Sequence, residues 1–167
     1  MKVLILAKKK TQKTNAIRLL EQKKIPFTVS EYAFSDEHMG AKSTAKELGV
    51  EESSIFKTLV IVGNKTGPLV AVVPGDKELD LKKIAKVSGN KKVEMLPQRE
   101  LEPLTGYIRG GCSPVGMKKQ LPTFFAKEAE NLELFHCSAG QRGLQLNINP
   151  SDLVKLLRAS FVDITVE

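Results

Sequence analysis

Two apolar stretches separated by a glycine-bounded turn constrain the fold of this chain most strongly. Phe56–Val62 and Pro68–Val73 are rich in Val, Ile and Leu, and they flank the turn-like segment Gly63–Gly67. Apolar, β-branched runs on either side of such a segment are typical of a β-hairpin. We therefore predict that the two stretches pair as antiparallel strands.

Capping residues and apolar spacing predict further elements around this hairpin. The expected helices are Thr14–Lys24, a short helix opened by a capping box of Thr44 and Glu47 and closed by Gly49, Leu81–Ser88 capped by Asp80, and a helix from Asn149–Pro150 to Arg158. The further expected strands are Phe27–Phe34, Lys92–Leu96, Tyr107–Arg109, Thr123–Ala126, Leu132–His136, Gly143–Ile148 and Phe161–Val166. Strands and helices do not alternate regularly, which predicts an α+β fold with a curved mixed β-sheet, barrel-like, and flanking helices.

The length of 167 residues fits one domain with a sizeable core. We expect residues 14–167 to form this domain. Residues 1–13 are a basic leader that could form a short extra strand, a basic arm or an artificial extension. Its apolar run, Val3–Ala7, is far too short for a signal-peptide core or a membrane span.

The net charge of +7 favours an anionic partner. Lys and Arg together number 26 against 19 for Asp and Glu, and most of the cations are lysines, which act on phosphates as point charges. A lysine surface that is merely solvated explains the charge equally well. The absence of Trp weakens any model in which bases stack on aromatic rings.

The cysteine pattern excludes several classes of site. Cys112 and Cys137 are single and distant, so neither a disulfide framework nor a zinc ribbon is indicated, and a reducing cytoplasm is the simple inference. The only histidines are His38 and His136. With so few possible ligands we expect no metal site and no cofactor. A nucleophilic Cys112 would need a nearby base, and His136 cannot form a dyad with its neighbour Cys137 because adjacent strand residues face opposite sides.

The glycine-rich segment Gly110–Gly116 is the most unusual stretch of the chain. It is no P-loop, because Cys112 stands where that motif requires lysine, and it is no nucleophile elbow, because Pro114 after Ser113 has no amide hydrogen. Glycines do allow consecutive amides to converge on an oxyanion or a ribose oxygen. The alternative is a tight turn with no further role.

Lys57 interrupts the apolar start of the first hairpin strand. From the residues alone, an edge-strand lysine that blocks aggregation is the simpler explanation. Strand alternation places its neighbour Thr58 on the opposite side.

Six ordered blocks of this sequence resemble the YbaK/EbsC family of free-standing aminoacyl-tRNA deacylases, relatives of the editing domain of bacterial prolyl-tRNA synthetases. The blocks are Phe56–Leu59, Leu79–Lys86, Lys91–Met95, Thr105–Pro114, Lys118–Pro122 and Gly140–Leu144. The resemblance implies a barrel-like mixed sheet and removal of a wrong amino acid, most typically cysteine, from proline tRNA. The implied partners are mischarged tRNA(Pro) and, as a further candidate, prolyl-tRNA synthetase.

The resemblance also assigns roles to particular residues. It implies that Lys57 anchors the terminal ribose or phosphate, that the amides of Gly110 and Gly111 polarise the ester carbonyl, and that the substrate thiol attacks its own ester, so that no protein nucleophile is required. The implied substrate-binding residues are Tyr32, Met39, Thr58, Ser113, Ser138 and Gln145, and the implied tRNA-binding residues are Lys118, Lys119 and Arg142. Met39 and Gln145 depart from relatives that carry Phe and Asp there, which leaves the substrate preference open.

Three other functions agree with the same sequence. The chain could be a non-catalytic tRNA-binding or adaptor module, or it could hydrolyse a small nucleotide or thioester ligand or another mischarged tRNA such as Ala-tRNA. Loss of deacylation on replacement of Lys57 separates the enzyme from the adaptor, and a steep dependence on salt separates tRNA from a small ligand.

Overall fold

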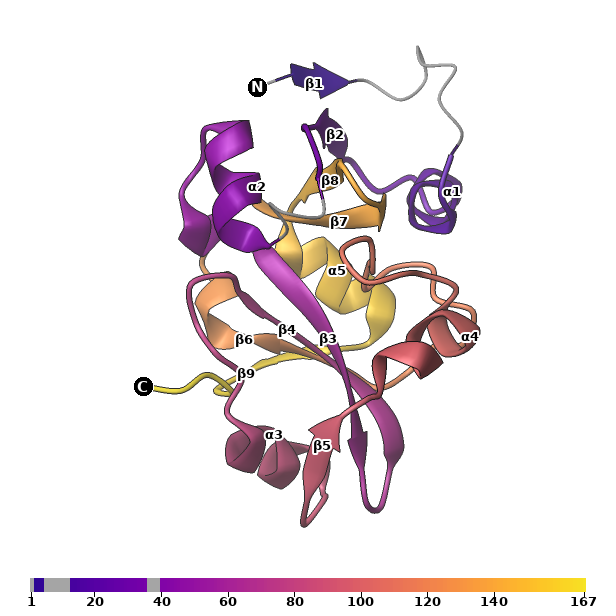
Figure 1. The fold of residues 1–167 in the computed structure, drawn as a ribbon, viewed down its shortest axis with the longest axis vertical. Helices are drawn as coiled ribbons and strands as arrows, with labels where there is room; N and C mark the ends of the chain where they lie inside the picture. Colours follow the sequence, from indigo (N-terminus) through magenta and orange to yellow (C-terminus); the bar gives the residue numbers. More distant parts are fainter. Residues whose placement is uncertain (1, 5–12, 36–39) are drawn as a thin grey trace.

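The computed structural model of the protein describes residues 2–4, 13–35 and 40–167 (Figure 1). The strands are β1 (Lys2–Leu4), β2 (Thr28–Glu31), β3 (Phe56–Gly63), β4 (Gly67–Pro74), β5 (Val93–Met95), β6 (Thr123–Ala126), β7 (Phe135–Gln141), β8 (Leu144–Ile148) and β9 (Ser160–Val162). The α-helices are α1 (Asn15–Gln22), α2 (Ala41–Leu48), α3 (Leu81–Ser88), α4 (Leu101–Thr105) and α5 (Pro150–Leu157), and short 3₁₀ turns are η3 (Glu52–Ser54), η4 (Gln98–Glu100) and η5 (Lys127–Ala129).

The strands form two sheets. One has the order β1-β2-β8-β7 and is antiparallel throughout. The other has the order β5-β3-β4-β6-β9, in which β4, β6 and β9 run parallel and the remaining pairs are antiparallel. The α+β class with a mixed sheet is therefore confirmed, but the described strands form two sheets rather than one closed barrel.

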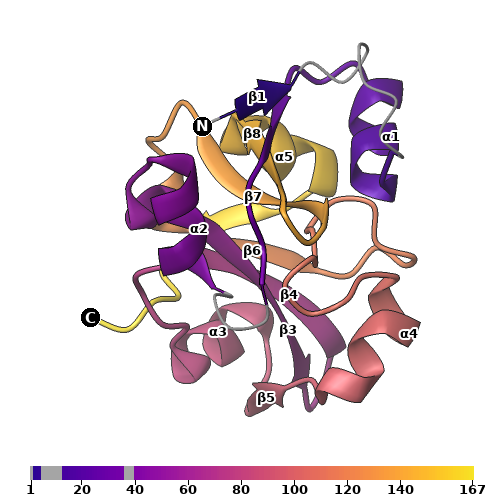
Figure 2. The same cartoon turned by 45° about the horizontal axis from the view of Figure 1, so that its top comes forward.

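The two sheets meet where β3 begins. Ile55 forms an isolated parallel bridge to His136 of β7, and the rings of Phe56 and Phe135 pack with their centroids 4.9 Å apart. Phe125 of β6 extends this contact, with its ring centroid 6.1 Å from that of Phe135. Figure 2 shows α2 and the start of β3 beside β7 at this junction. The junction brings residues from distant parts of the sequence to one place.

The hairpin and most of the helix ends agree with the sequence. The β3–β4 register runs from Phe56 opposite Pro74 to Gly63 opposite Gly67, which confirms the hairpin. The predicted caps are also present: the side chains of Thr14, Asp80 and Asn149 each accept a hydrogen bond from a backbone amide in the first turn of α1, α3 and α5. Gly49 and Gly89 end α2 and α3 in the left-handed conformation.

The capping box at Thr44 is wrong. The helix α2 begins at Ala41, and its N-cap is Gly40. Thr44 lies inside the first turn, and its hydroxyl donates a 3.0 Å hydrogen bond back to the carbonyl oxygen of Gly40. The Thr44 hydroxyl therefore donates to the carbonyl oxygen of Gly40, which also accepts the Thr44 amide, and it does not accept from a free backbone amide as a capping residue would.

Several strand boundaries also differ. Tyr107–Arg109 is not a strand, because this segment bends into the glycine loop, where Gly111 donates its amide to Ile108. β2 ends at Glu31, so Tyr32 and Phe34 lie beyond it, and β7 begins only at Phe135. In the described part of the chain, no helix is long and apolar enough to cross a membrane.

Candidate active site

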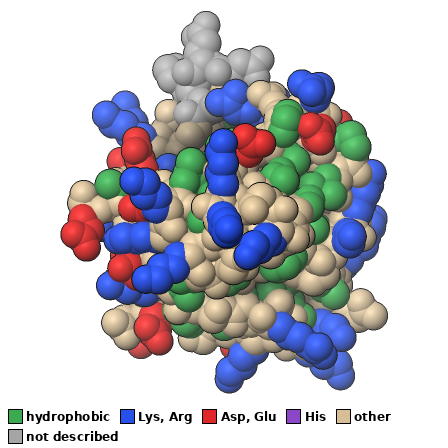
Figure 3. All heavy atoms as spheres, turned by 90° about the horizontal axis from the view of Figure 1, so that it is seen from below, with side chains coloured by type: hydrophobic (Ala, Val, Ile, Leu, Met, Phe, Trp, Pro, Cys, Tyr) green, Lys and Arg blue, Asp and Glu red, His purple; other side chains and the backbone are tan. Residues whose placement is uncertain are grey.

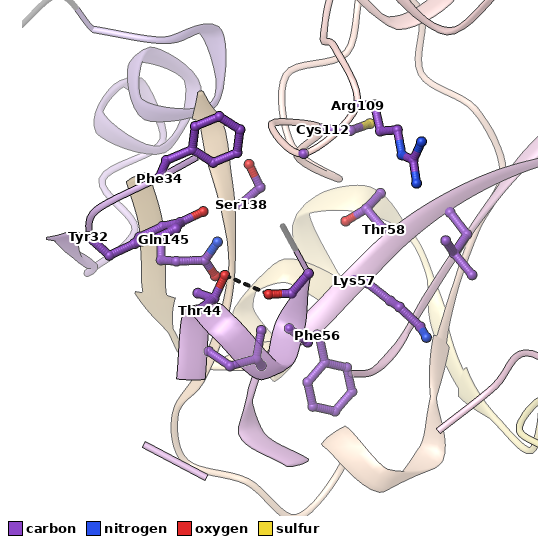
Figure 4. Close-up of a pocket in the computed structure, with 15 residues that line it drawn as sticks. Tyr32, Phe34, Thr44, Phe56, Lys57, Thr58, Arg109, Cys112, Ser138 and Gln145 are labelled. Carbon is purple, nitrogen blue, oxygen red and sulfur yellow. Dashed lines mark hydrogen bonds between the residues drawn. The ribbon is translucent and has the colours of Figure 1, made fainter. Parts of the chain in front are cut away.

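A cavity of about 280 Å³ lies at the junction of the two sheets (Figure 4). Five segments line it: the chain after β2, the start of α2, the start of β3, the glycine loop, and the paired strands β7 and β8. Its lining residues are Tyr32, Phe34, Gly40, Ala41, Thr44, Ile55, Phe56, Lys57, Thr58, Leu59, Arg109, Gly110, Cys112, Ser138 and Gln145. Six of the residues that the family resemblance assigns to the site line this cavity: Lys57, Thr58, Gly110, Tyr32, Ser138 and Gln145.

Lys57 and Thr58 lie on opposite sides of β3. Figure 4 shows the Thr58 side chain pointing toward Ser138 and Arg109, whereas the Lys57 side chain extends from the other side of the strand. Lys57 is half-buried, and it forms no ion pair with the carboxylates of the described residues. Without such a carboxylate partner, its ammonium group is available to an anionic or hydroxyl-rich part of a ligand.

The cavity wall contains two buried acceptors without a partner. Thr58 Oγ1 and Gln145 Oε1 are shielded from solvent, yet neither forms a hydrogen bond within the described part of the structure. Such atoms are rare, because an unpartnered buried polar atom costs about 1–3 kcal/mol. Both belong to residues that line the cavity. Each oxygen therefore keeps unused hydrogen-bonding capacity beside the cavity.

A β-bulge shapes the wall formed by β7 and β8. Ser138 lies opposite Gln145, and the register then shifts before Gln141 pairs with Leu144. Inside this bulge the Ser138 hydroxyl oxygen accepts a 3.1 Å hydrogen bond from the amide of Gly140, whose φ is +100°. A bulge re-aims the side chains beside it, and here it directs Ser138 and Gln145 toward the cavity.

Gly110 presents its backbone to the cavity. Its φ is +86°, in the left-handed region, and its amide has no hydrogen-bond partner within the described ranges. Gly110 therefore has a free amide donor in the glycine loop beside the cavity.

Gly111 differs from its predicted role. Its amide donates a 2.9 Å hydrogen bond to Ile108, and it does not line the cavity. A Cβ atom at Gly111 would lie 3.0 Å from the amide nitrogen of Arg142 and 3.1 Å from the carbonyl carbon of Gln141. Gly111 thus allows the loop to pack closely against the β7–β8 turn, and its amide is not available to a substrate carbonyl.

Cys112 lines the cavity as a buried thiol. Its side chain is buried, and burial raises the pKa of its thiol to about 12. The thiol is therefore protonated at neutral pH and is a poor nucleophile. Cys137 lies in the core, where burial also raises the pKa to about 12.

His136 belongs to a buried polar network beside the cavity. Its Nδ1 atom forms a hydrogen bond with Asn147 Oδ1. The amide group of Asn147 then donates to the hydroxyls of Ser30 and Thr28, at 2.8 and 3.1 Å. Burial lowers the pKa of His136, so its imidazole is neutral at neutral pH.

Four further residues with predicted roles, Ser113, Lys118, Lys119 and Arg142, do not line the cavity. Ser113 is fully buried, and its hydroxyl oxygen accepts a hydrogen bond from the amide of Val115, so Ser113 supports the loop. Lys118 and Lys119 are exposed beyond the loop. Arg142 lies over the Phe34 ring, 5.1 Å from its centroid, and donates to the carbonyl oxygen of Arg109. Met39 lies outside the described residues.

The residue types of the cavity limit its chemistry. Among the described residues, no group of three or more His, Cys, Asp or Glu side chains could hold a metal ion.

Sequence reasoning missed Phe34, Thr44 and Arg109 as lining residues. Phe34 lies two residues after Tyr32, and Arg109 directly precedes Gly110. Their nearness in sequence to predicted site residues is the feature that could have pointed to them.

Comparisons with known proteins identify the family of this chain. The sequence pattern of the aminoacyl-tRNA editing domain matches residues 36–156, which is most of the chain. The chain belongs to the aminoacyl-tRNA editing domain family. The family prediction and the predicted class of activity, removal of an amino acid from mischarged tRNA, are thereby confirmed.

Individual members of the editing domain family show how far the likeness extends. A protein of Enterococcus faecalis, EbsC, named as a candidate Cys-tRNA(Pro)/Cys-tRNA(Cys) deacylase, is 57% identical over 97% of this chain and 99% of its own length. A proline–tRNA ligase of Geotalea daltonii is 31% identical over 68% of this chain but only 20% of its own length. The crystal structure of a candidate trans-editing enzyme for prolyl-tRNA synthetase superimposes with a TM-score of 0.81 at 27% identity, covering 94% of this chain and all of the other.

Proposed function

We propose that this editing domain hydrolyses the ester of Cys-tRNA(Pro) in the cavity at the sheet junction. The observation that carries the proposal is a cavity that joins Lys57, a free Gly110 amide and two unpartnered acceptors, while its one thiol is held protonated. Such a site can hold and polarise an ester, but it has no activated nucleophile of its own. The name of the E. faecalis relative supports cysteine as the amino acid removed.

The cavity residues divide the substrate between them. Lys57, at the edge, binds the terminal ribose or phosphate, and the Gly110 amide donates to the ester carbonyl oxygen. The α-ammonium group of the amino acid is a donor without acceptor capacity. It therefore suits the unpartnered oxygens of Thr58 and Gln145. Tyr32 and Ser138 complete the walls around the amino-acid side chain.

The substrate thiol supplies the nucleophile in this proposal. The sulfur attacks the ester carbonyl carbon, a C–S bond forms, and the C–O bond to the ribose breaks. The departing ribose oxygen takes up the proton that the thiol loses. Water then opens the cyclic thioester and releases cysteine, so the protein contributes position and charge stabilisation.

The decisive experiment is single-turnover deacylation of Cys-tRNA(Pro) by an excess of enzyme. Lys57→Ala should slow the reaction about 100-fold or more, consistent with loss of a charge-assisted contact in the reacting state. Lys127→Ala removes an exposed cation elsewhere and should leave the rate unchanged. If the wild type binds tRNA but releases no amino acid from Cys-tRNA or Ala-tRNA, the chain is an adaptor.

Alkylation of the substrate tests the chemical step separately. Cys-tRNA(Pro) whose thiol carries a methyl group lacks the proposed nucleophile but retains the ester and the α-ammonium group. We expect it to bind and not to react. Rapid hydrolysis of this substrate would show instead that water attacks the ester directly. A cytoplasmic location and association with prolyl-tRNA synthetase stay predictions.

A further inference from the structure

Five lysines gather at the end of the molecule that lies farthest along β3 from the cavity. Lys65 lies in the turn of the β3–β4 hairpin, Lys82 and Lys86 are on α3, and Lys91 and Lys92 precede β5. All five are exposed. We call them the hairpin-end lysines. None of them forms an ion pair with a carboxylate of the described residues, whereas the neighbouring Lys83 is paired with Asp163 at 3.1 Å.

Two asparagine side chains hold the backbone beneath these lysines. Asn64 Oδ1 accepts hydrogen bonds from the amides of Lys91 and Lys92, at 2.9 and 3.0 Å. In the opposite direction, Asn90 Oδ1 accepts from the amides of Lys65 and Thr66, at 2.8 and 3.0 Å. These four hydrogen bonds join the β3–β4 turn to the loop before β5, and we call the joined segments the braced unit. The side chains of Lys65, Lys91 and Lys92 all project from this unit.

The asparagine brace is well packed. Asn90 is 8% exposed, and its amide nitrogen also donates to the hydroxyls of Thr66 and Ser88. The backbone of Gly63 approaches the Asn90 side chain so closely that a Cβ atom there would overlap it. A solvated lysine surface needs no such fixed backbone.

Figure 3 looks onto this end of the molecule. Lysine and arginine side chains spread over the face, and carboxylates are fewer and lie mainly toward one side. Glu94 of β5 is the exposed acid closest in sequence to the braced unit. The field of this face therefore favours an extended anion.

We propose that the hairpin-end lysines bind the phosphate backbone of the tRNA whose aminoacylated end occupies the cavity; this inference rests on the proposed function. From Lys57 to Gly63 the strand advances six residues, which is about 20 Å at the usual rise per residue. A cation cluster at that distance would contact the tRNA body rather than its reacting end. Lysines act as point charges on phosphates, so this contact should add affinity without reading base sequence.

The test combines two triple variants with two substrates. Lys65→Gln/Lys91→Gln/Lys92→Gln removes three charges from the braced unit, and Lys23→Gln/Lys127→Gln/Lys155→Gln removes three exposed charges elsewhere. Each variant is assayed for binding of uncharged tRNA across a salt series and for deacylation of Cys-tRNA(Pro). The second substrate is a cysteinylated fragment of the tRNA 3′ end that reaches only the cavity.

We expect the hairpin-end variant to bind tRNA about 10-fold or more weakly at low salt, with a salt slope lower by about 2 to 3. It should deacylate the short fragment at the wild-type rate. The control variant should match the wild type in both assays. Equal losses in the two triple variants, or unchanged tRNA affinity in the hairpin-end variant, would overturn the inference. Wild-type failure to deacylate either substrate, with the affinity difference intact, would reject the proposed function and leave this surface standing.

Discussion

Tyr107 donates a 2.6 Å hydrogen bond from its hydroxyl to the carbonyl oxygen of Val115, and both residues are buried. The bond joins the two ends of the segment that carries Gly110 and Cys112. Burial raises the pKa of Tyr107, so the hydroxyl keeps its proton and remains a donor throughout the pH range of ordinary assays. The shape of the glycine loop therefore depends on one side chain that does not line the cavity.

Replacing Tyr107 by Phe tests this dependence. The carbonyl oxygen of Val115 would stay buried and lose this donor, which should lower the free energy of unfolding by about 1–3 kcal/mol. We expect deacylation to slow several-fold because Gly110 is no longer held in place. Denaturant unfolding and single-turnover kinetics measure the two effects. Slower deacylation without loss of stability would show that Tyr107 acts on the substrate directly.

Gly111→Ala should be harmful although Gly111 does not line the cavity. The added methyl group would lie 3.0–3.2 Å from backbone atoms of Gln141 and Arg142, which cannot move as freely as a side chain. We expect a loss of about 1–3 kcal/mol in stability, typical of overpacking, and a fall in deacylation as the loop shifts. If the rate falls while the unfolding curve stays unchanged, Gly111 has the direct role that the family resemblance implies.

Cys112→Val should preserve most of the activity. Burial raises the pKa of Cys112 to about 12, so almost no thiolate exists at neutral pH. Valine fills a similar volume and cannot act as a nucleophile. We expect a rate within about 3-fold of wild type, because a volume-conserving change costs little. A loss comparable to that of Lys57→Ala would mean that Cys112 takes part in the reaction.

His136 should make the protein less stable in mild acid. Burial lowers its pKa below 6.5, so the unfolded chain binds a proton more readily than the folded one. Stability is therefore fully present above about pH 6.5 and is lost as the pH falls below it, by at most about 1.4 kcal/mol per pH unit for this group. His136→Gln can still bond to Asn147 but does not titrate.

The test for His136 compares how much stability the wild type and His136→Gln each lose between two pH values. Unfolding free energies of wild type and His136→Gln are compared between about pH 8 and about pH 5.5, so that carboxylates common to both proteins cancel. The wild type should lose more stability than the variant toward acid. Parallel curves for the two proteins would contradict the assigned shift.

Local features of the sequence predicted much of the fold. Thr14, Asp80 and Asn149 cap their helices as expected, because a cap depends on a few adjacent residues. The hairpin register follows for the same reason from the strand lengths and the turn. Thr44 shows the limit of this reasoning, since its hydroxyl had two possible backbone partners and took the carbonyl of Gly40.

The cavity depends on contacts that no local pattern contains. The parallel pairing of β4, β6 and β9 and the meeting of Ile55 with His136 join segments far apart in the sequence. The family resemblance supplied Lys57, Gly110 and Ser138, and the structure adds that they share one cavity. It also shows that the Gly111 amide is already bonded, which depends on the exact turn at Ile108.

Thr58→Val and Gln145→Met should separate stability from activity. Each removes a buried oxygen that has no hydrogen-bond partner in the described structure, while roughly keeping the side-chain volume. Stability should be unchanged or increase by up to about 1–3 kcal/mol, because an unsatisfied polar atom is replaced by an apolar one. Deacylation should fall about 10-fold or more for each, since the substrate ammonium group loses an acceptor.

The control for this pair is Ser113→Ala. Ser113 is also buried, but its hydroxyl oxygen accepts a hydrogen bond from the amide of Val115. Ser113→Ala leaves that amide without its acceptor, so any fall in deacylation should be accompanied by a loss of stability. Thermal unfolding and single-turnover kinetics on Cys-tRNA(Pro) provide both readouts. If Thr58→Val and Gln145→Met instead lose stability like Ser113→Ala, the two oxygens are already hydrogen-bonded in the free protein and are not available to the substrate.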